Sequence, residues 1–459
     1  MTLIKSISGI RGTIGGRVGE GLSPLDVVKF TSAYGTWLQQ EAKKKDLTVV
    51  IGRDARISGP MVESLVLATL QGLGINVIHL GLSTTPTVEL AVMHEKADGG
   101  IILTASHNPK QWNALKLLNG KGEFVSGEDG ARILSIAEAE DFNFADVDDL
   151  GSYELKTDWI EKHIQLIAEL DLVDFELVKE KKFKVAVDAV NSTGGISIPP
   201  LLEAMGCEVV PLYTEPTGHF PHNPEPLKEH LTEICELVKA EGCDLGIVVD
   251  PDVDRLALID EEGEMFGEEY TLVAVADYIL QNTPGPTVSN LSSSLALKDV
   301  TEAHGCTYSP SAVGEVNVVV EMKRVNATIG GGGNGGIIYP ELHYGRDALV
   351  GIALVLTYMA KVDKSLATLK SSYPQYFMAK EKIALDPTMD VDGILEQMKE
   401  KYASENPITI DGVKIIFNRE WVHLRKSNTE PIIRIYTEST SLEKAKELAH
   451  RIMDEIRSL

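Results

Sequence analysis

The sequence predicts an α/β protein of several domains, followed by a C-terminal α+β domain with an antiparallel sheet. Along most of the chain, short β-rich runs alternate with stretches of helical apolar spacing, a pattern typical of βαβ units and mainly parallel sheets. From about residue 371 onward, closely spaced strand-like runs replace this alternation, and one helix closes the chain. A length of 459 residues exceeds what a single hydrophobic core accommodates, which also favours several domains.

The first domain is predicted to cover residues 1–150. Its β-rich runs are residues 47–51, 76–80 and 100–103, and residues 60–73, between the first two runs, have helical apolar spacing. The acidic stretch 138–149 has no regular apolar register, so we expect a linker or an exposed edge there.

The alternation repeats in two further α/β domains, at residues 151–258 and 259–368, and gives way to the α+β domain at residues 369–459. In the second and third domains the predicted strands are 183–187, 208–212, 245–249 and 287–290, and the predicted helices are 159–172, one that ends at 205, and 296–304. In the last domain we expect strands at 382–385, 413–417, 421–424 and 432–437 and a helix at 442–456.

Composition excludes several classes of function. The formal net charge of -25 argues against nucleic acid as a partner, because phosphate backbones require a basic face. No run of about 18 apolar residues predicts a membrane span, and the N-terminus lacks a basic-then-apolar leader. The four cysteines show no CxxC spacing, which favours a reducing cytoplasm over a disulfide framework or a zinc site.

A serine motif follows one of the predicted buried strands. Residues 104–109 read Thr-Ala-Ser-His-Asn-Pro and come directly after the apolar run 99–103. The hydroxyl of Ser106 is therefore expected at the carboxyl end of a strand, where α/β proteins bind their ligands. Seen alone, a serine beside a histidine is more often a turn or capping residue.

Three carboxylates follow another buried strand. Asp250, Asp252 and Asp254 are spaced i, i+2 and i+4 after the run 245–249, and on a strand this spacing places them on one face. Like charges that close repel one another unless a cation lies among them, and oxygen ligands favour Mg²⁺. An EF-hand is rejected because Arg255 replaces the glycine required at its sixth position. A phosphatase with an aspartyl nucleophile stays open, as does a solvated acidic turn.

Two further loops add polar and cationic groups. The glycine run 330–336 lacks the helix that would follow a dinucleotide fingerprint, so we interpret it as a loop where backbone approaches a ligand closely. Residues 425–431, between two predicted strands, combine hydroxyls, an amide and flanking arginines, a set that suits phosphate. Lys116 would serve as an acid or base if burial lowered its pKa.

With these motifs in hand, the chain resembles the α-D-phosphohexomutases, which include phosphoglucomutase, phosphomannomutase and phosphoglucosamine mutase. Four loops occur in the order of that family: the phosphoserine loop 104–109, the metal loop 250–255, the sugar loop 331–336 and the phosphate loop 425–431. The resemblance implies three similar mixed-sheet α/β domains around a central cleft, with a mobile C-terminal domain as a lid.

The resemblance also implies roles for individual residues. Ser106 would carry the phosphoryl group, and Asp250, Asp252 and Asp254 would hold Mg²⁺ together with the phosphoryl oxygen on Ser106. The active-site polar groups would be Arg11, His107, Lys116 and Arg255, with Lys116 as the proton acceptor. The groups expected to bind the substrate are Asn334, Glu315, Arg425, Ser427, Asn428, Thr429 and Arg434.

One position departs from the family pattern. Family members commonly have a glutamate in the sugar loop, where this chain has Gly332, so Asn334 and a carboxylate from Glu315 would remain as sugar contacts. The Gly-Asn-Gly-Gly ending of the loop is most similar to that of phosphoglucosamine mutases.

These observations predict an enzyme that interconverts hexose 6-phosphate and hexose 1-phosphate through a phosphoserine and a sugar 1,6-bisphosphate intermediate. Its partner would be a small phosphosugar, with Mg²⁺ as cofactor, and we expect it in the cytoplasm. Within the family, phosphoglucosamine mutase is favoured over phosphoglucomutase or phosphomannomutase. Two other classes stay open: a metal-dependent sugar-phosphate phosphatase and a non-catalytic sugar-phosphate sensor, which Gly332 makes conceivable.

Overall fold

Two units, each made of separate stretches of the chain, divide the computed structural model. The described residues are 2–6, 9–42, 44–384, 390–426 and 432–458. The first unit contains residues up to 271 and residues 334–367, and the second contains residues 272–333 and those from 368 onward. Helices α9 (Tyr270–Asn282) and α13 (Leu366–Ser371) span two of the three points where the chain passes from one unit to the other, and the third lies between residues 333 and 334.

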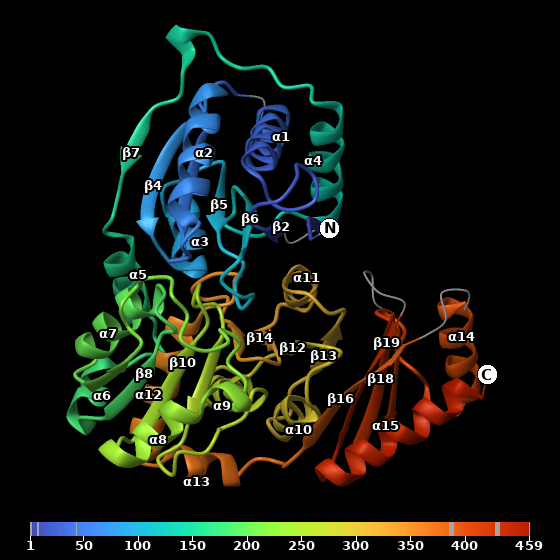
Figure 1. Ribbon diagram of the computed structural model, residues 1–459. Coiled ribbons are helices and arrows are strands. Elements are labelled where there is room, and N and C mark those ends of the chain that lie inside the picture. The colour runs from blue at the N-terminus through green and yellow to red at the C-terminus, as the bar shows by residue number, and fades with distance from the viewer. Residues whose placement is uncertain (1, 7–8, 43, 385–389, 427–431, 459) are drawn as a thin grey trace. The chain divides into compact units, whose positions relative to one another are not determined.

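The first unit begins with a mixed sheet in the order β1-β2-β6-β5-β3-β4-β7 (Figure 1). Its strands are β1 (Ile4–Ser6), β2 (Gly9–Thr13), β3 (Thr48–Arg53), β4 (Asn76–Leu82), β5 (Gly99–Leu103), β6 (Trp112–Asn119) and β7 (Tyr153–Leu155). The strands β5, β3, β4 and β7 are parallel, whereas β6, β2 and β1 add antiparallel pairs at the other edge. The chain beyond residue 150 thus returns to the first sheet as β7 before it enters the second.

Helices cover this sheet. They are α1 (Pro24–Ala42), α2 (Gly59–Gly72), α3 (Thr85–His94) and α4 (Gly127–Ala139). Phe30 of α1, Val62 of α2 and Ile133 of α4 share one buried cluster with Val49 of β3 and Ile101 of β5. All five residues of β5 are buried, as expected for a central strand whose two faces are covered. The segment that follows β5 therefore starts from a fixed point.

The second sheet, also in the first unit, has the order β11-β10-β8-β9. Its strands are β8 (Lys184–Asp188), β9 (Glu208–Leu212), β10 (Leu245–Val249) and β11 (Leu256–Ile259). The unit also contains α5 (Trp159–Ala168), α6 (Phe175–Lys181), α7 (Gly194–Ala204), α8 (Thr232–Glu241), α12 (Ala348–Val362), the short strand β15 (Gly336–Ile338), and the 3-10 turns η1 (Val147–Asp149) and η2 (Lys228–His230). The strands β9, β8 and β10 are parallel, and β11 returns antiparallel to β10. The six-residue segment between β10 and β11 carries the three aspartates.

The second unit contains parallel strands β13 (Tyr308–Ser311), β12 (Thr287–Asn290) and β14 (Ile329–Gly332), side by side in that order. Helices α10 (Leu295–Ala303) and α11 (Glu315–Val325) connect them. As in the first unit, strands alternate with helices along the chain, which is the pattern that the sequence predicted here.

An antiparallel sheet in the order β16-β19-β18-β17 completes the second unit. Its strands are β16 (Phe377–Ala384), β17 (Val413–Phe417), β18 (Glu420–Lys426) and β19 (Ile432–Ser439), and it is accompanied by α14 (Val391–Lys401), η3 (Ala403–Glu405) and α15 (Leu442–Arg457). Leu448 and Ile452 of α15 are buried in one cluster with Ile433 and Ile435 of β19. The predicted fold class, α/β domains followed by an α+β domain with an antiparallel sheet, is confirmed.

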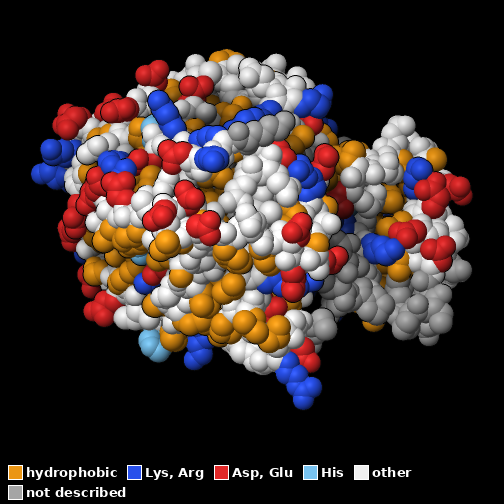
Figure 2. All heavy atoms as spheres, turned by 90° about the horizontal axis from the view of Figure 1, so that it is seen from above, with side chains coloured by type: hydrophobic (Ala, Val, Ile, Leu, Met, Phe, Trp, Pro, Cys, Tyr) orange, Lys and Arg blue, Asp and Glu red, His pale blue; other side chains and the backbone are white. Residues whose placement is uncertain are grey.

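The surface agrees with the composition. On the face seen in Figure 2, acidic and basic side chains are interspersed, and apolar side chains gather in a band across the lower part of the larger body. Among the described residues, no helix combines the length and the apolar character needed to cross a membrane.

Candidate active site

Ser106 lies in the turn that follows β5, with its backbone in the left-handed region at a φ of 49°. Its N–H donates a hydrogen bond to Thr104 Oγ1 over 2.9 Å, which holds the turn. Its hydroxyl donates to Asp250 Oδ2 over 2.6 Å, although the two residues are 144 positions apart in sequence. The serine motif and the aspartate motif, each predicted at the end of a buried strand, therefore meet in the first unit.

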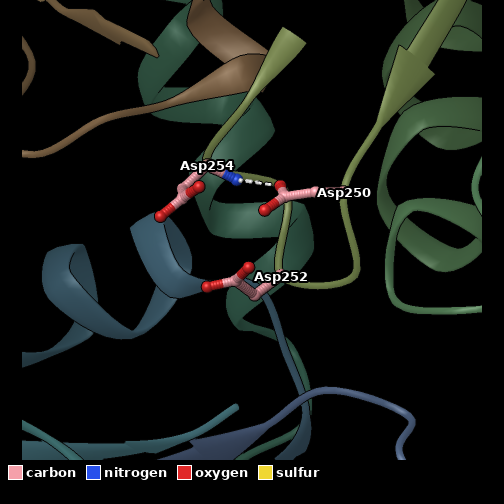
Figure 3. Close-up of side chains that lie close together, drawn as sticks. All are labelled: Asp250, Asp252 and Asp254. Atoms are coloured by element: carbon pink, nitrogen blue, oxygen red, sulfur yellow. Dashed lines mark hydrogen bonds between the residues drawn. The ribbon is translucent and has the colours of Figure 1, made fainter. Parts of the chain in front are cut away.

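The three aspartates lie in a turn, which corrects the prediction that a strand face presents them. Val253 adopts a φ of 63°, so the chain bends between Asp252 and Asp254. One carboxylate oxygen from each aspartate lies within 4.8 Å of the others (Figure 3). The N–H groups of Asp254 and Arg255 donate to Asp250 Oδ1 over 3.2 and 3.1 Å, which closes the turn around that carboxylate.

This cluster has the properties of a divalent cation site. All three aspartates are buried, and burial raises the pKa of Asp250 well above its usual range, with the charges of Asp254 and Asp252 adding to the effect. Among the described residues, no hydrogen-bond partner reaches the buried Oδ1 atoms of Asp252 and Asp254. Oxygen-only ligands with unused lone pairs fit Mg²⁺, the cation that the resemblance implies, so the residues present fit the expected metal.

Two cations neutralise the opposite side of the cluster. Lys116 of β6 places its Nζ 2.6 Å from Asp252 Oδ2 and 3.4 Å from Asp254 Oδ2. Burial alone would lower the pKa of Lys116, but these two carboxylates outweigh it and raise the pKa above its usual value. The condition that the sequence analysis set for an acid–base role of Lys116, a lowered pKa, is therefore not met in this structure. The charge and the hydrogen bond of Lys116 in turn lower the pKa of Asp252 in spite of its burial, with the Thr85 hydroxyl as a further cause.

The second cation, Arg346, is a residue that sequence reasoning missed. Its Nη2 lies 2.6 Å from Asp254 Oδ2 across 92 residues of sequence. The next residue, Asp347, accepts hydrogen bonds from the N–H groups of Leu349 and Val350 and caps α12. An aspartate before an apolar helix was a readable capping signal, but nothing local showed where the arginine points.

His107, Arg255 and Glu225 line the serine side. His107 Nδ1 is 3.4 Å from Ser106 Oγ, and Arg255 Nη1 is 3.5 Å from Glu225 Oε1. Burial lowers the pKa of His107 to about 3, with the charges of Arg255 and Arg346 as further causes. His107 is therefore neutral near neutral pH, and it offers this site a hydrogen bond rather than a charge.

Arg11 approaches from a neighbouring strand. It lies on β2 directly opposite Ala114 of β6, and opposite residues of an antiparallel pair share a face of the sheet. Lys116, two residues beyond Ala114, projects from that same face. Burial lowers the pKa of Arg11. The structure thus brings Arg11 and Lys116 to one side of the sheet.

Asn334 belongs to a tight turn at the start of β15. It adopts a φ of 72°, and Gly335 follows at 73°. A side-chain carbon on Gly335 would lie 1.9 Å from the carbonyl oxygen of Leu256, so only glycine fits there. Leu256 comes two residues after Asp254, and its N–H donates to Gly335 O over 3.1 Å. This half of the predicted sugar loop is thereby fixed against the turn that carries the aspartates.

The other predicted substrate-binding residues belong to the second unit. Glu315 is the first residue of α11, and Arg425 of β18 lies directly opposite Arg434 of β19. The predicted contacts Ser427, Asn428 and Thr429 lie outside the described residues.

Asp411, which sequence reasoning missed, links two of these segments. Its Oδ2 lies 3.0 Å from Arg425 Nη2 and accepts the N–H of Val313 over 2.9 Å, two residues before Glu315. The structure therefore connects the end of β18 with the segment before α11.

Taken together, the first unit holds a serine hydroxyl, an acidic cluster that fits Mg²⁺ and several cations around both. This is the equipment of a phosphoryl-transfer enzyme, since such enzymes position a phosphoryl group and stabilise its charge. Comparison with known proteins identifies the family. Residues 4–144, 161–263, 267–376 and 379–455 match, in turn, alpha/beta/alpha domains I, II and III and the C-terminal domain of phosphoglucomutase/phosphomannomutase.

Relatives that align over nearly their whole length indicate the same family. A phosphoglucomutase/phosphomannomutase of Thermococcus kodakarensis is 37% identical over 442 residues, which are 95% of this chain and 96% of that protein. A phosphoglucosamine/phosphogalactosamine mutase of Sulfurisphaera tokodaii is 32% identical over 458 residues, 98% of this chain and 97% of that one. A crystal structure of a phosphoglucomutase/phosphomannomutase family protein from Burkholderia thailandensis has the same fold, with a TM-score of 0.84 at 24% identity over 100% of this chain and 97% of the other.

The chain therefore belongs to the phosphoglucomutase/phosphomannomutase family. It is a phosphohexomutase, and so an isomerase of the α-D-phosphohexomutase superfamily. The resemblance to this family that the four loops indicated is confirmed.

Proposed function

We propose that this phosphohexomutase transfers its phosphoryl group through Ser106 and prefers glucosamine phosphates. The observation that carries the proposal is the 2.6 Å hydrogen bond from Ser106 Oγ to Asp250 Oδ2, one of three clustered carboxylates. It supports a serine whose phosphoryl group would lie beside a bound Mg²⁺. When bound, Mg²⁺ would neutralise phosphoryl charge in the transition state.

In this scheme a phosphorylated Ser106 gives its phosphoryl group to a hydroxyl of a hexose monophosphate. The bond between phosphorus and the serine oxygen breaks, a bond to the sugar oxygen forms, and a sugar 1,6-bisphosphate results. The proton that the sugar hydroxyl loses balances the one that the released serine oxygen gains. The bisphosphate then turns over, and Ser106 regains a phosphoryl group from the other end. The cations Lys116 and Arg255 would offset the charge of the transferring group.

The phosphate that does not react needs a separate grip. We assign it to Arg425 and Arg434, with Ser427, Asn428 and Thr429 as further contacts. Arginine forks bind phosphate bidentately, and the pairing of Arg425 with Arg434 across β18 and β19 places two of them side by side. A grip that accepts either phosphate of the bisphosphate would allow both halves of the reaction to use one site.

The preference for glucosamine rests on the sugar loop. Asn334 and Glu315 are the assigned sugar contacts, because Gly332 replaces the usual glutamate. The Gly-Asn-Gly-Gly ending supports this lean, and the relative from Sulfurisphaera tokodaii is a phosphoglucosamine/phosphogalactosamine mutase. The relative from Thermococcus kodakarensis, a phosphoglucomutase/phosphomannomutase, makes glucose and mannose phosphates the alternative substrates.

A substrate panel tests this proposal. The 6-phosphates of glucosamine, glucose and mannose are each incubated with the protein, Mg²⁺ and the matching sugar 1,6-bisphosphate, and products are followed by phosphorus NMR. We expect the highest kcat/KM for conversion of glucosamine 6-phosphate to its 1-phosphate, with lower values for the 6-phosphates of glucose and mannose. Release of inorganic phosphate without isomerised sugar would favour the phosphatase alternative, and tight binding without turnover would favour a sensor.

A further inference from the structure

Arg56, in the turn that follows β3, is completely buried, with a side-chain exposure of 0%. Its guanidinium is nevertheless fully hydrogen-bonded. Nε donates to Asp54 Oδ2 over 2.9 Å, and the two terminal nitrogens donate to backbone carbonyl oxygens. These carbonyls belong to Ser106, Asn108 at 2.7 Å, Pro109 at 2.8 Å and Trp112 at 3.0 Å. All five donors of the guanidinium therefore have an acceptor.

Four of these five acceptors lie in one segment, residues 106–112, which contains Ser106 and ends at the first residue of β6. A buried cation is costly unless it is paired and hydrogen-bonded, so its position here needs a physical reason. A planar fork with fixed donor directions can hold four carbonyls in one arrangement, whereas a flexible ammonium cannot. Arg56 thus holds the backbone carbonyls of the loop, while the hydroxyl of Ser106 in the same loop bonds to Asp250.

The conformation of Ser106 requires such support. A non-glycine residue at positive φ costs roughly 1 kcal/mol or more and persists only where the surroundings determine it. Asp54 supplies a second restraint, because its Oδ2 accepts the hydroxyl of Thr104 over 2.7 Å, and Thr104 Oγ1 in turn accepts the N–H of Ser106.

The same turn also reaches the loop of the aspartates. The N–H of Ala55 donates to Ser192 Oγ over 3.3 Å, and Ser192 Oγ donates to the carbonyl oxygen of Pro251 over 2.7 Å. Pro251 lies between Asp250 and Asp252. Residues 54–56 therefore contact the two loops that meet at the hydrogen bond between Ser106 and Asp250.

We infer that Arg56 is a positioning residue for phosphoryl transfer. It holds the loop of Ser106 so that the hydroxyl faces the aspartate cluster. Direct contact with substrate is excluded by its burial and by the use of all five donors within the protein. The inference rests on the proposed role of Ser106.

Arg56→Lys tests it, because lysine keeps the charge and loses the fork. We expect kcat to fall by roughly 10²-fold while KM stays within about threefold, since a misplaced reacting group slows chemistry without weakening binding of the distal phosphate. Arg53→Lys is the matched control: Arg53 belongs to the same segment and is ion-paired to Glu63 over 3.1 Å, and it should change kcat by less than about threefold.

Hydrogen exchange separates positioning from general destabilisation. In Arg56→Lys, amides of residues 104–112 should exchange faster, whereas amides of β3 and β4 and the affinity for Mg²⁺ alone should stay near those of the wild type. Faster exchange throughout the first unit, with kcat and KM both impaired, would overturn the inference in favour of a purely structural role. Unchanged exchange in residues 104–112, or an unchanged kcat, would also overturn it.

A second variant covers the case in which Arg56→Lys does not fold. Thr104→Val is nearly isosteric and removes only the hydroxyl between Asp54 and the N–H of Ser106, so it should lower kcat by about tenfold with little change in KM. An unchanged kcat in Thr104→Val would contradict the positioning account. One combination of results separates the two proposals. If Arg56→Lys speeds exchange in residues 104–112 as expected, but Ser106 of the wild-type protein accepts no phosphoryl group, the proposed function fails while the structural role of Arg56 stands.

Discussion

The surroundings of Ser106 in the first unit and the arginine pair of the second unit are built in opposite ways. Ser106, the three aspartates and Arg56 are buried, and each is held by hydrogen bonds from several segments. Arg434, by contrast, is exposed, and Arg425 is half-buried with one carboxylate partner, Asp411. We conclude that the group proposed to form and break bonds is buried and held on several sides, whereas the groups proposed to grip phosphate are more exposed to solvent.

The two sites also differ in the sign of the charges that lie close together. Lys382 of β16, Arg434 and Arg425 lie directly opposite one another across three adjacent strands, so three like charges line one face of the sheet. Like charges opposite one another destabilise a sheet unless an anion joins them. Asp411 supplies one anion, and the phosphate of a substrate would supply another. In the first unit three carboxylates lie close together, and the expected partner is a cation.

The largest effect should come from the acidic cluster. Asp252→Ala removes one proposed Mg²⁺ ligand together with the partner of Lys116 at 2.6 Å and of the Thr85 hydroxyl at 2.6 Å. We expect kcat to fall by about 10³-fold or more, because a bound cation supplies several kcal/mol of transition-state stabilisation. Steady-state kinetics at saturating Mg²⁺ measures this. Asp158→Ala, at an exposed aspartate paired with Lys162, is the control and should leave kcat unchanged. A kcat above a tenth of the wild-type value in Asp252→Ala would contradict the assignment.

Two buried histidines, one in each unit, should respond to pH in opposite directions. In the first unit, His343 lies 3.2 Å from a carboxylate oxygen of Glu89 and of Asp347. Burial lowers its pKa, but these two groups outweigh burial and raise the pKa to about 9. Because the folded pKa exceeds the unfolded value near 6.5, the stabilisation, roughly 3 kcal/mol, is complete below pH 6.5 and lost as pH rises toward 9.

In the second unit, burial lowers the pKa of His423 to about 4. Its Nε2 bonds to the carbonyl oxygen of Asp411 and its Nδ1 to the Ser292 hydroxyl, an arrangement that suits a neutral ring. Its stabilisation is therefore present above pH 6.5 and lost as pH falls toward 4. Hydrogen exchange of each unit against pH measures both effects, and His343→Gln and His423→Gln should each flatten the profile of its own unit. A pH profile that either substitution leaves unchanged would contradict the role assigned to that histidine.

The phosphate grip should show itself in binding. Arg425→Ala is expected to raise KM by about 10- to 100-fold with a smaller change in kcat, because a charge-assisted hydrogen bond contributes about 1.5–3 kcal/mol in ground state and transition state alike. The neighbouring Lys426, exposed and paired with Asp392 over 2.7 Å, provides the control Lys426→Ala, for which KM should change by less than about twofold. A fall in kcat at constant KM in Arg425→Ala would place this arginine in the chemical step instead.

The smallest effect concerns the choice of sugar. A side-chain carbon on Gly332 would lie 2.6 Å from the amide nitrogen of Asn290, the end of a side chain that can turn away. Gly332→Ala should therefore change kcat/KM less than about threefold for any hexose 6-phosphate. Gly332→Glu should shift the ratio of kcat/KM between glucose 6-phosphate and glucosamine 6-phosphate by about three- to tenfold, the size of one hydrogen bond. If the two variants have the same ratio of kcat/KM between these substrates, position 332 does not determine the choice of sugar.

The sequence predicted the parts of the site that are local. Buried apolar runs end at Ser106 and at Asp250, and the carboxyl ends of such strands are where α/β proteins place ligands. The same reasoning misplaced the aspartates on a strand face, because alternating spacing does not show that Val253 turns into the left-handed region.

What the sequence did not reveal depends on contacts between distant segments. Arg346 contacts Asp254, 92 residues away, and Asp411 accepts a hydrogen bond from Val313, 98 residues away. The role of Arg56 likewise depends on a loop about 50 residues further along the chain. An arginine in a Gly-Arg-Asp-Ala-Arg segment is more often a surface residue, and only the folded chain shows that all its donors end on one loop.

The most direct test of the account locates the phosphoryl group. The protein is incubated with glucose 1,6-bisphosphate and Mg²⁺, digested, and mapped by tandem mass spectrometry, in parallel with Ser106→Ala. We predict one phosphoryl group on the peptide that contains Ser106, its loss on addition of a hexose 6-phosphate, and none in the variant. A phosphoryl group found on Asp250, or a wild-type Ser106 that stays unmodified, would contradict the account.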